Sequence, residues 1–374
     1  MEFEYTQEQL ALQDTLGRFY AREYSFEHRR GVAQSVEGFD RKAWSTFAKI
    51  GILALPFPEE YGGLNGNAVD SMLVMEMLGR GLALEPYLST VVLCGGLIRD
   101  AGSAAQCQAL LPAIGRGEKL LGFAHFEPQS RYERESVATT AKASGTGWKI
   151  SGAKSVVIGG PAADVLITSA REDSGLSLFL VDAKSPGVRM RAYKTQDGGR
   201  AADIEFADVA VGADARLGPS GGAIALIERA LDCASAALCA ESVGIMSALQ
   251  ELTLEYLKTR QQFGVPIGRF QALQHRMADM VIAIEQARSM AILAAVQADN
   301  ADADARRRAV AGACAYVDAQ ARFVGQQAVQ LHGGMGVTDE INVAHYFKRL
   351  TMIGMTYGDA DFHLRRFSDT LLAS

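Results

Sequence analysis

A polar cluster follows a long predicted helix in the second half of the chain. The helical run that starts at Ala223 reaches Arg260, and a turn of sequence Gln-Gln-Phe-Gly-Val-Pro separates it from the next helical run. A planar guanidinium at such a helix end could clamp a pyrophosphate through paired hydrogen bonds. Arg260 could instead bond the last carbonyls of its own helix, and periodicity alone favours this second interpretation.

A second candidate is a carboxylate within the same predicted helix. Glu241 lies on the edge of an apolar stripe at helical spacing, formed by Leu238, Ile245, Leu249, Leu252 and Tyr256. A carboxylate that faces a protein core is unfavourable unless it is paired or functional. Glu241 is therefore either a catalytic base or one half of an ion pair with a neighbouring Arg or Lys.

Composition excludes several classes of protein. The net charge of −6 gives no reason to expect binding to nucleic acid or to an acidic membrane. The chain has an odd number of scattered cysteines without a C-x-x-C pair, which favours reduced thiols and a cytoplasmic location and argues against a zinc site: Cys94, Cys107, Cys233, Cys239 and Cys314. We expect no metal, no signal peptide and no membrane-spanning segment.

Hydrophobic periodicity divides the chain into three parts. A capping-box pattern at Thr6 and Gln9 predicts the start of a first helix, and further helical runs follow up to residue 114. Short runs with β-branched residues then predict strands, and helices return at Ala223. The order α, β, α predicts domains at 1–117, 118–218 and 219–374. No G-x-G-x-x-G motif follows a strand, so a nicotinamide Rossmann fold is unsupported.

Four segments carry a resemblance to a known family. They are residues 51–63, 75–79, 260–280 and the stretch Gln330-Leu-His-Gly-Gly-Met-Gly336. The chain resembles the acyl-CoA dehydrogenases over nearly its whole length. The resemblance implies an α+β protein with an N-terminal helical domain, a middle antiparallel β-domain and a C-terminal four-helix bundle. It also implies flavin-dependent α,β-desaturation of an acyl-CoA thioester, with FAD as the cofactor.

The resemblance also implies which residues touch the flavin dinucleotide. In the family, the arginine that corresponds to Arg260 contacts the FAD of a neighbouring subunit. The full implied set is Arg260, Gln262, Phe263, Phe270, Gln271, Gln330, Gly333 and Gly334. Glycine lets a ligand approach the main chain closely, although Gly333 and Gly334 also suit simple helix termination.

The sequence departs from the family at the reacting end of the site. Most members carry their base in a Tyr-Glu-Gly-Thr segment, but here Gly358 stands at the Glu position, which leaves Glu241 as our candidate base. Phe126 replaces a flavin-facing Thr, and Val156-Val157-Ile158 replaces Trp-Ile-Thr. The hydroxyls and the indole that hold the flavin ring are absent, so backbone amides would have to hold it.

This asymmetry predicts that the site is shared between chains. The sequence resembles the small subunits of α2β2 acyl-CoA dehydrogenases, such as the pimeloyl-CoA and steroid side-chain types. Expected partners are an acyl-CoA substrate, a second acyl-CoA dehydrogenase subunit or further copies of this chain, and an electron-transfer flavoprotein. Two alternatives stay open, namely a non-catalytic partner subunit and a self-sufficient homotetramer.

Overall fold

The computed structural model describes residues 5–372, which form two compact units. The helical unit consists of the residues up to Arg30, residues 68–83, and the chain from Ser235 onward. The sheet unit consists of residues 31–67 and 84–234. Both units therefore interleave segments from the first third of the chain, and helix α7 contributes residues to each of them.

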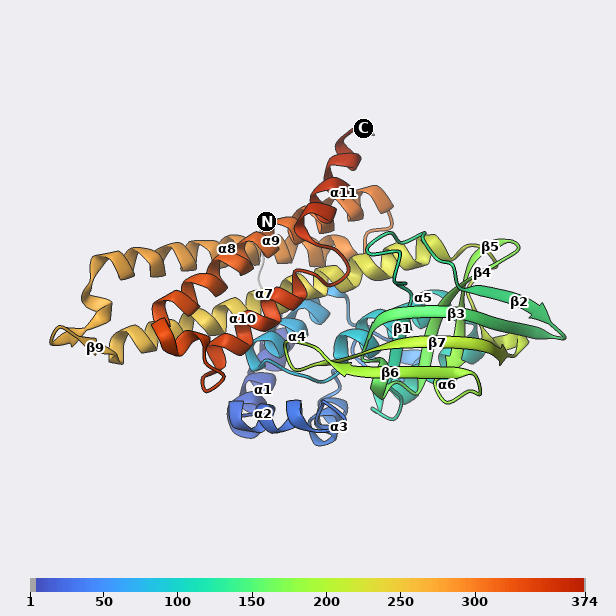
Figure 1. The fold of residues 1–374 in the computed structure, drawn as a ribbon, viewed down its shortest axis with the longest axis horizontal. Coiled ribbons are helices and arrows are strands. Elements are labelled where there is room, and N and C mark those ends of the chain that lie inside the picture. The colour runs from blue at the N-terminus through green and yellow to red at the C-terminus, as the bar shows by residue number, and fades with distance from the viewer. Residues whose placement is uncertain (1–4, 373–374) are drawn as a thin grey trace. The chain divides into compact units, whose positions relative to one another are not determined.

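Long helices dominate the helical unit, where α8, α9 and α10 run alongside one another (Figure 1). The capping box at Thr6 and Gln9 is confirmed at the start of α1. Alanines on the buried side of α8, among them Ala287, Ala291 and Ala294, let α9 pack closely against it. The elements are α1 (Gln7–Glu23), α2 (Phe26–Gln34), α4 (Ala68–Gly81), α7 (Ala223–Thr259), β9 (Gln261–Gln262), β10 (Val265–Pro266), α8 (Gln271–Ala298), α9 (Ala303–His332), α10 (Asn342–Ile353) and α11 (Ala360–Leu372).

Two glycines bring the backbones of α4 and α7 into direct contact. A Cβ atom at Gly79 would overlap the main chain of Glu241, and a Cβ atom at Gly244 would overlap the main chain of Glu76. No other residue type fits at these two positions without moving a helix. This contact fixes the middle of α7, which carries Glu241.

The sheet unit contains an eight-stranded sheet of order β6-β7-β3-β2-β4-β5-β8, with β1 paired to β4. Most pairs are antiparallel, as expected, but β1 and β2 each pair with β4 in parallel. The chain enters β1 from helix α6 and leaves it through the long segment 125–139, so β1 has no hairpin partner. The strands are β1 (Leu121–Ala124), β2 (Thr140–Ser144), β3 (Gly147–Ile158), β4 (Val165–Glu172), β5 (Gly175–Asp182), β6 (Val188–Lys194), β7 (Arg200–Val211) and β8 (Arg216–Leu217).

Shorter helices complete the sheet unit and the connections. Gly51 ends α3 (Arg41–Ile50) in the left-handed conformation, which glycine adopts without strain. Residues 88–101 form a π-helix, η2 (Leu88–Gly95), followed by α5 (Gly96–Ala101), and α6 is Ala104–Gly115. Short 3₁₀ turns are η1 (Glu59–Tyr61), η3 (Gly160–Ala162), η4 (Ala213–Ala215), η5 (Ile267–Arg269) and η6 (Gly333–Val337).

None of the helices between residues 5 and 372 has the length and apolarity needed to cross a bilayer. Across the same residues, no three His, Cys, Asp or Glu side chains gather in a way that could hold a metal ion. The five cysteines are free thiols, although the Sγ atoms of Cys239 and Cys314 lie 3.6 Å apart.

Candidate active site

The turn after α7 is a closed hairpin at one end of the helical unit (Figure 1). The amide of Arg260 donates to the carbonyl of Tyr256 at 2.8 Å, and the carbonyl of Arg260 accepts from the amide of Ile267 at 2.8 Å. Strands β9 and β10 lie between these bonds, with Phe263 at the tip in a left-handed conformation (φ 54°). A bulky residue in that conformation is strained, and such strain often marks a functional site.

A ring stack joins this hairpin to the end of α9. Tyr256 on α7 stacks on His332, with ring centroids 4.5 Å apart and 28° between the ring planes. Burial lowers the pKa of His332, whose Nδ1 lies 2.8 Å from the carbonyl oxygen of Ala328. The amide of Gly333 donates to the carbonyl of Gln330 and ends the helix. Two sequence motifs about seventy residues apart are therefore tied together by the stack.

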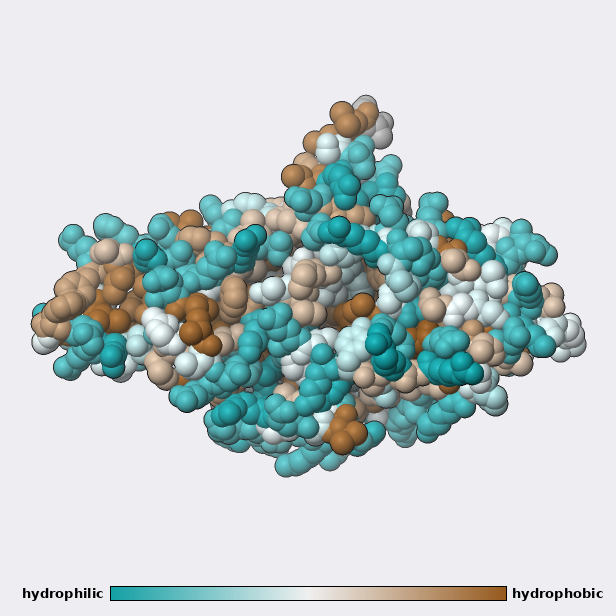
Figure 2. All heavy atoms as spheres, in the orientation of Figure 1, coloured by the Kyte–Doolittle hydropathy of each residue, from teal (hydrophilic) through white to brown (hydrophobic). Residues whose placement is uncertain are grey.

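The predicted cofactor residues are all exposed in the single chain. Phe263 and Phe270 are 89% and 39% exposed and meet edge to face at 6.1 Å. Hydrophobic atoms gather around the end of the helical unit that carries β9 (Figure 2). Exposed aromatic groups of this size indicate a surface that another molecule covers. The remaining members of the predicted set, Arg260, Gln262, Gln271, Gln330, Gly333 and Gly334, are likewise exposed.

The polar groups of this surface fit the nucleotide tail of a flavin dinucleotide. Within the described residues, the Arg260 guanidinium makes no ion pair or hydrogen bond, so it does not cap its own helix. The carboxamides of Gln271 and Gln330 are equally unengaged there. A Cβ atom at Gly333 or Gly334 would meet nothing within 4 Å, which leaves the main chain open to a ligand. The donors suit phosphate and ribose oxygens, and the two aromatic rings offer a stacking surface.

Glu241 has a different environment from the one that a base requires. It is 5% exposed on α7, and both of its carboxylate oxygens accept hydrogen bonds from Arg349 on α10, at 2.6 Å and 2.8 Å. A bidentate guanidinium engages both oxygens and stabilises the charged carboxylate. This geometry is the ion pair that the sequence allowed as the alternative, and Glu241 as a base stays a prediction without geometric support.

A small cavity of about 30 Å³ lies beside Gly358 in the helical unit. That volume holds one or two water molecules. Its walls come from α7 (Ser235, Leu238, Cys239, Ser242), from α9 (Cys314, Val317, Asp318), and from α10, α11 and the segment between them (Ile353, Gly354, Thr356, Gly358, Ala360, His363). Glu241 does not line it.

The side chains packed around this cavity leave no room for a glutamate at position 358. A Cβ atom at Gly358 would lie 2.5 Å from Phe362 Cδ1 and 2.6 Å from His363 Nε2. Gly358 has φ 149°, and the preceding Tyr357 has φ 62°, so the segment is strained as well as crowded. A side chain cannot extend from position 358 unless the rings of Phe362 and His363 move.

Sequence reasoning missed Asp318 and Ser235, which both line this cavity. Asp318 follows Val317 on α9 and lies on the same helical face as the buried Cys314 and Ala321. A charged residue on that face is the same signal that singled out Glu241. Ser235 carried no sequence signal, because a serine within an apolar helix is common.

The surface predicted to face the flavin ring lies in the sheet unit. Val156 is 54% exposed with φ 53°, where a register shift interrupts the pairing of β3 and β7. Its amide donates to Asp203 Oδ1 at 3.2 Å, and the amide of Ser155 donates to the carbonyl of Phe126 at 2.9 Å. The amide of Glu127 donates to Ser130 Oγ at 2.8 Å. Three amides of this surface are therefore already engaged, which limits what the backbone can offer a flavin ring.

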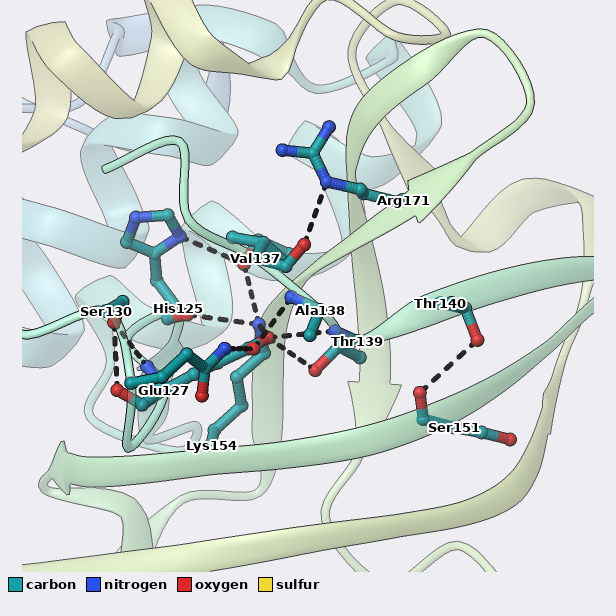
Figure 3. Close-up of polar contacts among 12 residues, drawn as sticks. His125, Glu127, Ser130, Val137, Ala138, Thr139, Thr140, Ser151, Lys154 and Arg171 are labelled. Carbon is teal, nitrogen blue, oxygen red and sulfur yellow. Dashed lines mark hydrogen bonds and ion pairs between the residues drawn. The ribbon is translucent and has the colours of Figure 1, made fainter. Parts of the chain in front are cut away.

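A buried polar network holds this surface in place (Figure 3). Lys154 Nζ donates to Glu127 Oε1 at 2.7 Å, to the carbonyl of His125 at 3.0 Å and to Ser169 Oγ at 3.0 Å. Glu127 also accepts hydrogen bonds from the amides of Ala138 and Thr139 and from the Thr139 hydroxyl. Every proton of the ammonium group has an acceptor, so both ends of the segment 125–139 are fixed to β3.

Burial and pairing act in opposite directions on these groups. Burial by itself would raise the pKa of Glu127, but hydrogen bonds from Lys154 and Thr139 outweigh it and hold that pKa at about 2. Burial lowers the pKa of Lys154 to about 8. Burial, with Lys154 and Arg134 nearby, lowers the pKa of His125 to about 3, so its imidazole is neutral at pH 7.

Comparisons with known proteins agree with this architecture. The chain matches three family models, described as the N-terminal (residues 6–118), middle (122–209) and C-terminal (221–372) domains of acyl-CoA dehydrogenase. "Acyl-CoA dehydrogenase FadE27" of Mycobacterium tuberculosis is 31% identical over 354 residues, or 92% of each chain. Mitochondrial short-chain specific acyl-CoA dehydrogenase of Homo sapiens is 30% identical over 81% of this chain and 76% of its own length.

Solved structures are similar over the whole chain. A variant of the steroid ACAD Tcur3481-Tcur3483 has a TM-score of 0.90 and 31% identity, with 98% of both chains covered. The ChsE4-ChsE5 complex of Mycobacterium tuberculosis has a TM-score of 0.91 and 29% identity, with 100% of both chains covered. The chain belongs to the acyl-CoA dehydrogenase family, whose members are FAD-dependent oxidoreductases that oxidise acyl-CoA thioesters.

Proposed function

We propose that this chain is one subunit of an α2β2 acyl-CoA dehydrogenase that desaturates the α,β bond of an acyl-CoA. Arg260, Gln271 and Gln330 would hold the nucleotide tail of an FAD whose ring lies against another subunit. Gln262, Phe263, Phe270 and the Gly333-Gly334 turn would complete that surface. When bound, the flavin accepts the hydride that leaves the β carbon.

One observation carries this proposal. An unengaged guanidinium, unengaged carboxamides and two exposed aromatic rings share one end of the helical unit, and no part of residues 5–372 covers them. The similarity to Tcur3481-Tcur3483 and to the ChsE4-ChsE5 complex, whose names each join two proteins, favours a partner that is a different chain. An electron-transfer flavoprotein is the proposed acceptor of the electrons.

A non-catalytic partner subunit is the second candidate. It is favoured by the absence of a carboxylate at position 358 and by the ion pair that occupies Glu241. In that case the chain would hold the tail of its partner's FAD and leave proton removal to the partner. A homotetramer of this chain alone is the remaining arrangement.

The ratio of flavin to chain separates the shared site from the homotetramer. It is measured from flavin absorbance on the chain expressed alone and on the assembly purified from the native host. A colourless chain and a yellow assembly support the shared site, whereas one flavin per chain in the isolated protein supports the homotetramer. A non-catalytic partner would hold the flavin in the same position, and it is supported instead if an assembly that carries Glu241→Gln keeps full activity.

Arg260→Leu tests the surface itself. We expect the assembly with this variant to lose most of its flavin, because the guanidinium pairs with the pyrophosphate. Arg307→Leu, which removes a partly exposed arginine of α9 that pairs with Asp304 at 3.5 Å, is the matched control and should keep its flavin. Full flavin retention in Arg260→Leu would overturn the assignment.

A further inference from the structure

A pair of stacked rings joins the two segments that carry the predicted FAD-binding residues. Tyr256 lies on the last turn of α7, and its carbonyl accepts the amide of Arg260 at 2.8 Å. His332 ends α9, two residues after Gln330 and directly before Gly333. The ring centroids of Tyr256 and His332 lie 4.5 Å apart, with 28° between the ring planes. Neither ring belongs to the set of residues that the sequence predicts to touch FAD.

The imidazole of His332 is held by its own helix and is almost fully buried. It is 4% exposed, and its Nδ1 lies 2.8 Å from the carbonyl oxygen of Ala328. A carbonyl can only accept, so Nδ1 carries a proton and donates it, which fixes the plane of the ring. A Cβ atom at Gly336 would lie 2.4 Å from the carbonyl oxygen of Val329, so the turn after α9 lies directly against the end of that helix. A shift of His332 would therefore carry the Gly333-Gly334 turn with it.

The hairpin after α7 is likewise fixed to the helices that flank it. The carbonyl of Arg260 accepts the amide of Ile267 at 2.8 Å, and the carbonyl of Gly268 accepts Gln274 Nε2 at 2.9 Å. A Cβ atom at Gly268 would lie 3.0 Å from the carbonyl oxygen of Leu257, so η5 lies close to the last turn of α7. These contacts hold each segment to its own helices, whereas the ring stack lies between the two segments.

A second link near this end of the helical unit is open to solvent. Arg276 Nη1 on α8 donates to Gln327 Oε1 on α9 at 3.0 Å, and this hydrogen bond is exposed. Water competes for an exposed hydrogen bond, whereas it does not displace a ring stack that is buried on one side. The stack of Tyr256 on His332 is therefore better suited to hold the two segments at one spacing. It also stabilises the fold, and the experiments below separate these two roles.

We propose that Tyr256 and His332 are positioning residues for the flavin tail, because their stack sets the spacing between the Arg260 guanidinium and the Gln330 carboxamide. The inference rests on the proposed function. Both groups that would meet the tail are exposed, so their spacing depends on the backbone that the two rings hold. A surface whose groups are already spaced for a ligand binds it more tightly, since less order has to be gained on binding.

The first test measures the affinity for FAD. The assembly is stripped of flavin and titrated with FAD, and the quenching of flavin fluorescence gives the Kd. We expect Tyr256→Leu to raise the Kd by about three- to tenfold, the range that the loss of an aromatic pair implies. Tyr256→Phe keeps the ring and should restore the wild-type Kd. An unchanged Kd in Tyr256→Leu overturns the proposal.

Tyr316→Leu is the matched control for an effect on stability alone. Tyr316 lies on α9 about 24 Å from His332 along the helix axis, and its hydroxyl donates to Gln286 Oε1 on α8. Both leucine variants remove a ring from the helical unit, so both should lower the thermal unfolding midpoint of the flavin-free assembly. Only Tyr256→Leu should weaken FAD binding. Equal losses of FAD affinity in the two variants would show that the stack serves the fold alone.

A double-mutant cycle tests whether the two rings act together and through the predicted FAD-binding residues. His332→Gln removes the imidazole and retains a donor for the Ala328 carbonyl, and it is an independent variant if Tyr256→Leu does not assemble. The double variant should bind FAD no more weakly than His332→Gln, because both changes remove the same contact. In a Gln330→Ala background, Tyr256→Leu should have a much smaller effect on the Kd. Full additivity in both comparisons overturns the proposal.

The outcomes separate this inference from the proposed function. If Arg260→Leu keeps its flavin, the predicted FAD-binding surface is wrong, and the role of the stack falls with it. If Arg260→Leu loses its flavin while Tyr256→Leu and His332→Gln bind FAD as wild type does, the surface stands and only the positioning role is overturned.

Discussion

Two buried polar clusters, one in each unit, differ in how completely their groups are paired. In the sheet unit, Lys154 and Glu127 have a partner for every proton of the ammonium and for both carboxylate oxygens. In the helical unit, the cavity beside Gly358 contains a carboxylate and a hydroxyl, on Asp318 and Ser235, that have no hydrogen-bond partner among residues 5–372. The paired cluster positions a surface, whereas the unpaired cluster has capacity left for a ligand or a proton.

The largest effect on stability is expected when the buried Lys154–Glu127 pair loses its cation. Lys154→Met would leave the Glu127 carboxylate buried without its cation, and we expect a loss of about 3–5 kcal/mol of unfolding free energy. Urea denaturation of the purified chain measures it. The double variant Lys154→Met, Glu127→Leu should recover part of the loss. A loss below about 1 kcal/mol would show that the network does not support the fold.

Lowering the pH tests the contribution of the Lys154–Glu127 cluster to stability. The pKa of Glu127 is held at about 2, below its ordinary 4.5, so the native state binds fewer protons than the unfolded chain between these values. The stability that Glu127 contributes is therefore complete above pH 4.5 and is lost as the pH falls toward 2. Urea midpoints from pH 6 to pH 3 should fall more steeply in wild type than in Glu127→Gln. Parallel curves would contradict the assignment.

Position 358 tests whether the helical cavity tolerates any side chain. Gly358→Ala places a Cβ atom against Phe362 and His363 at a strained φ, and we expect a loss of about 2–4 kcal/mol. Gly358→Glu should lose at least as much and should not increase the rate of desaturation. A well-folded Gly358→Glu variant with increased activity would show that the cavity opens easily.

The ion pair of Glu241 is less completely buried than the Lys154–Glu127 pair, so we expect a smaller effect from breaking it. Its carboxylate is buried but Arg349 is partly exposed, so Glu241→Gln should lower the unfolding free energy by about 1–3 kcal/mol. If Glu241 only orients α10, the protons on the α carbon of a CoA thioester should still exchange with solvent in this variant. Loss of exchange with unchanged stability would instead restore Glu241 as the base.

An exposed ion pair should give the smallest change in unfolding free energy. Arg80 and Glu251 meet at 2.9 Å, but their side chains are 34% and 58% exposed. Solvent screens such pairs, so Glu251→Gln should change the unfolding free energy by less than about 0.5 kcal/mol. A larger effect would mean that the distinction between buried and exposed pairs does not hold in this chain.

Features encoded within a few residues could be predicted from the sequence. The capping box at Thr6 and the family fold are examples, and the structure confirms them. The start of α10 shows the limit of such patterns. Thr338 is a residue type that often caps a helix, but it bonds back to Met335 in a 3₁₀ turn and the helix begins only at Asn342. Local patterns therefore predicted the elements better than their boundaries.

Contacts between distant residues were not predictable. The sequence offered two interpretations of Glu241, and the deciding partner, Arg349, lies more than a hundred residues later. The crowding around Gly358 depends on how α11 packs, which no spacing rule gives. Asp318 lies on an apolar helical face beside Val317, which is the signal that singled out Glu241, but it is far in sequence from the family's usual base position. The flavin contacts of Arg260 and its neighbours stay predictions.

The length of helix α7 and its contact with α4 couple the positions of residues at its two ends. With 37 residues it is a rod about 55 Å long, pinned at its middle by the glycine contact with α4. Ser235 sits on one side of that pivot and Arg260 beyond the other end. A tilt of α7 about this contact would move Ser235 and Arg260 in opposite directions. A mutation that tilts the helix near Ser235 would therefore also displace Arg260.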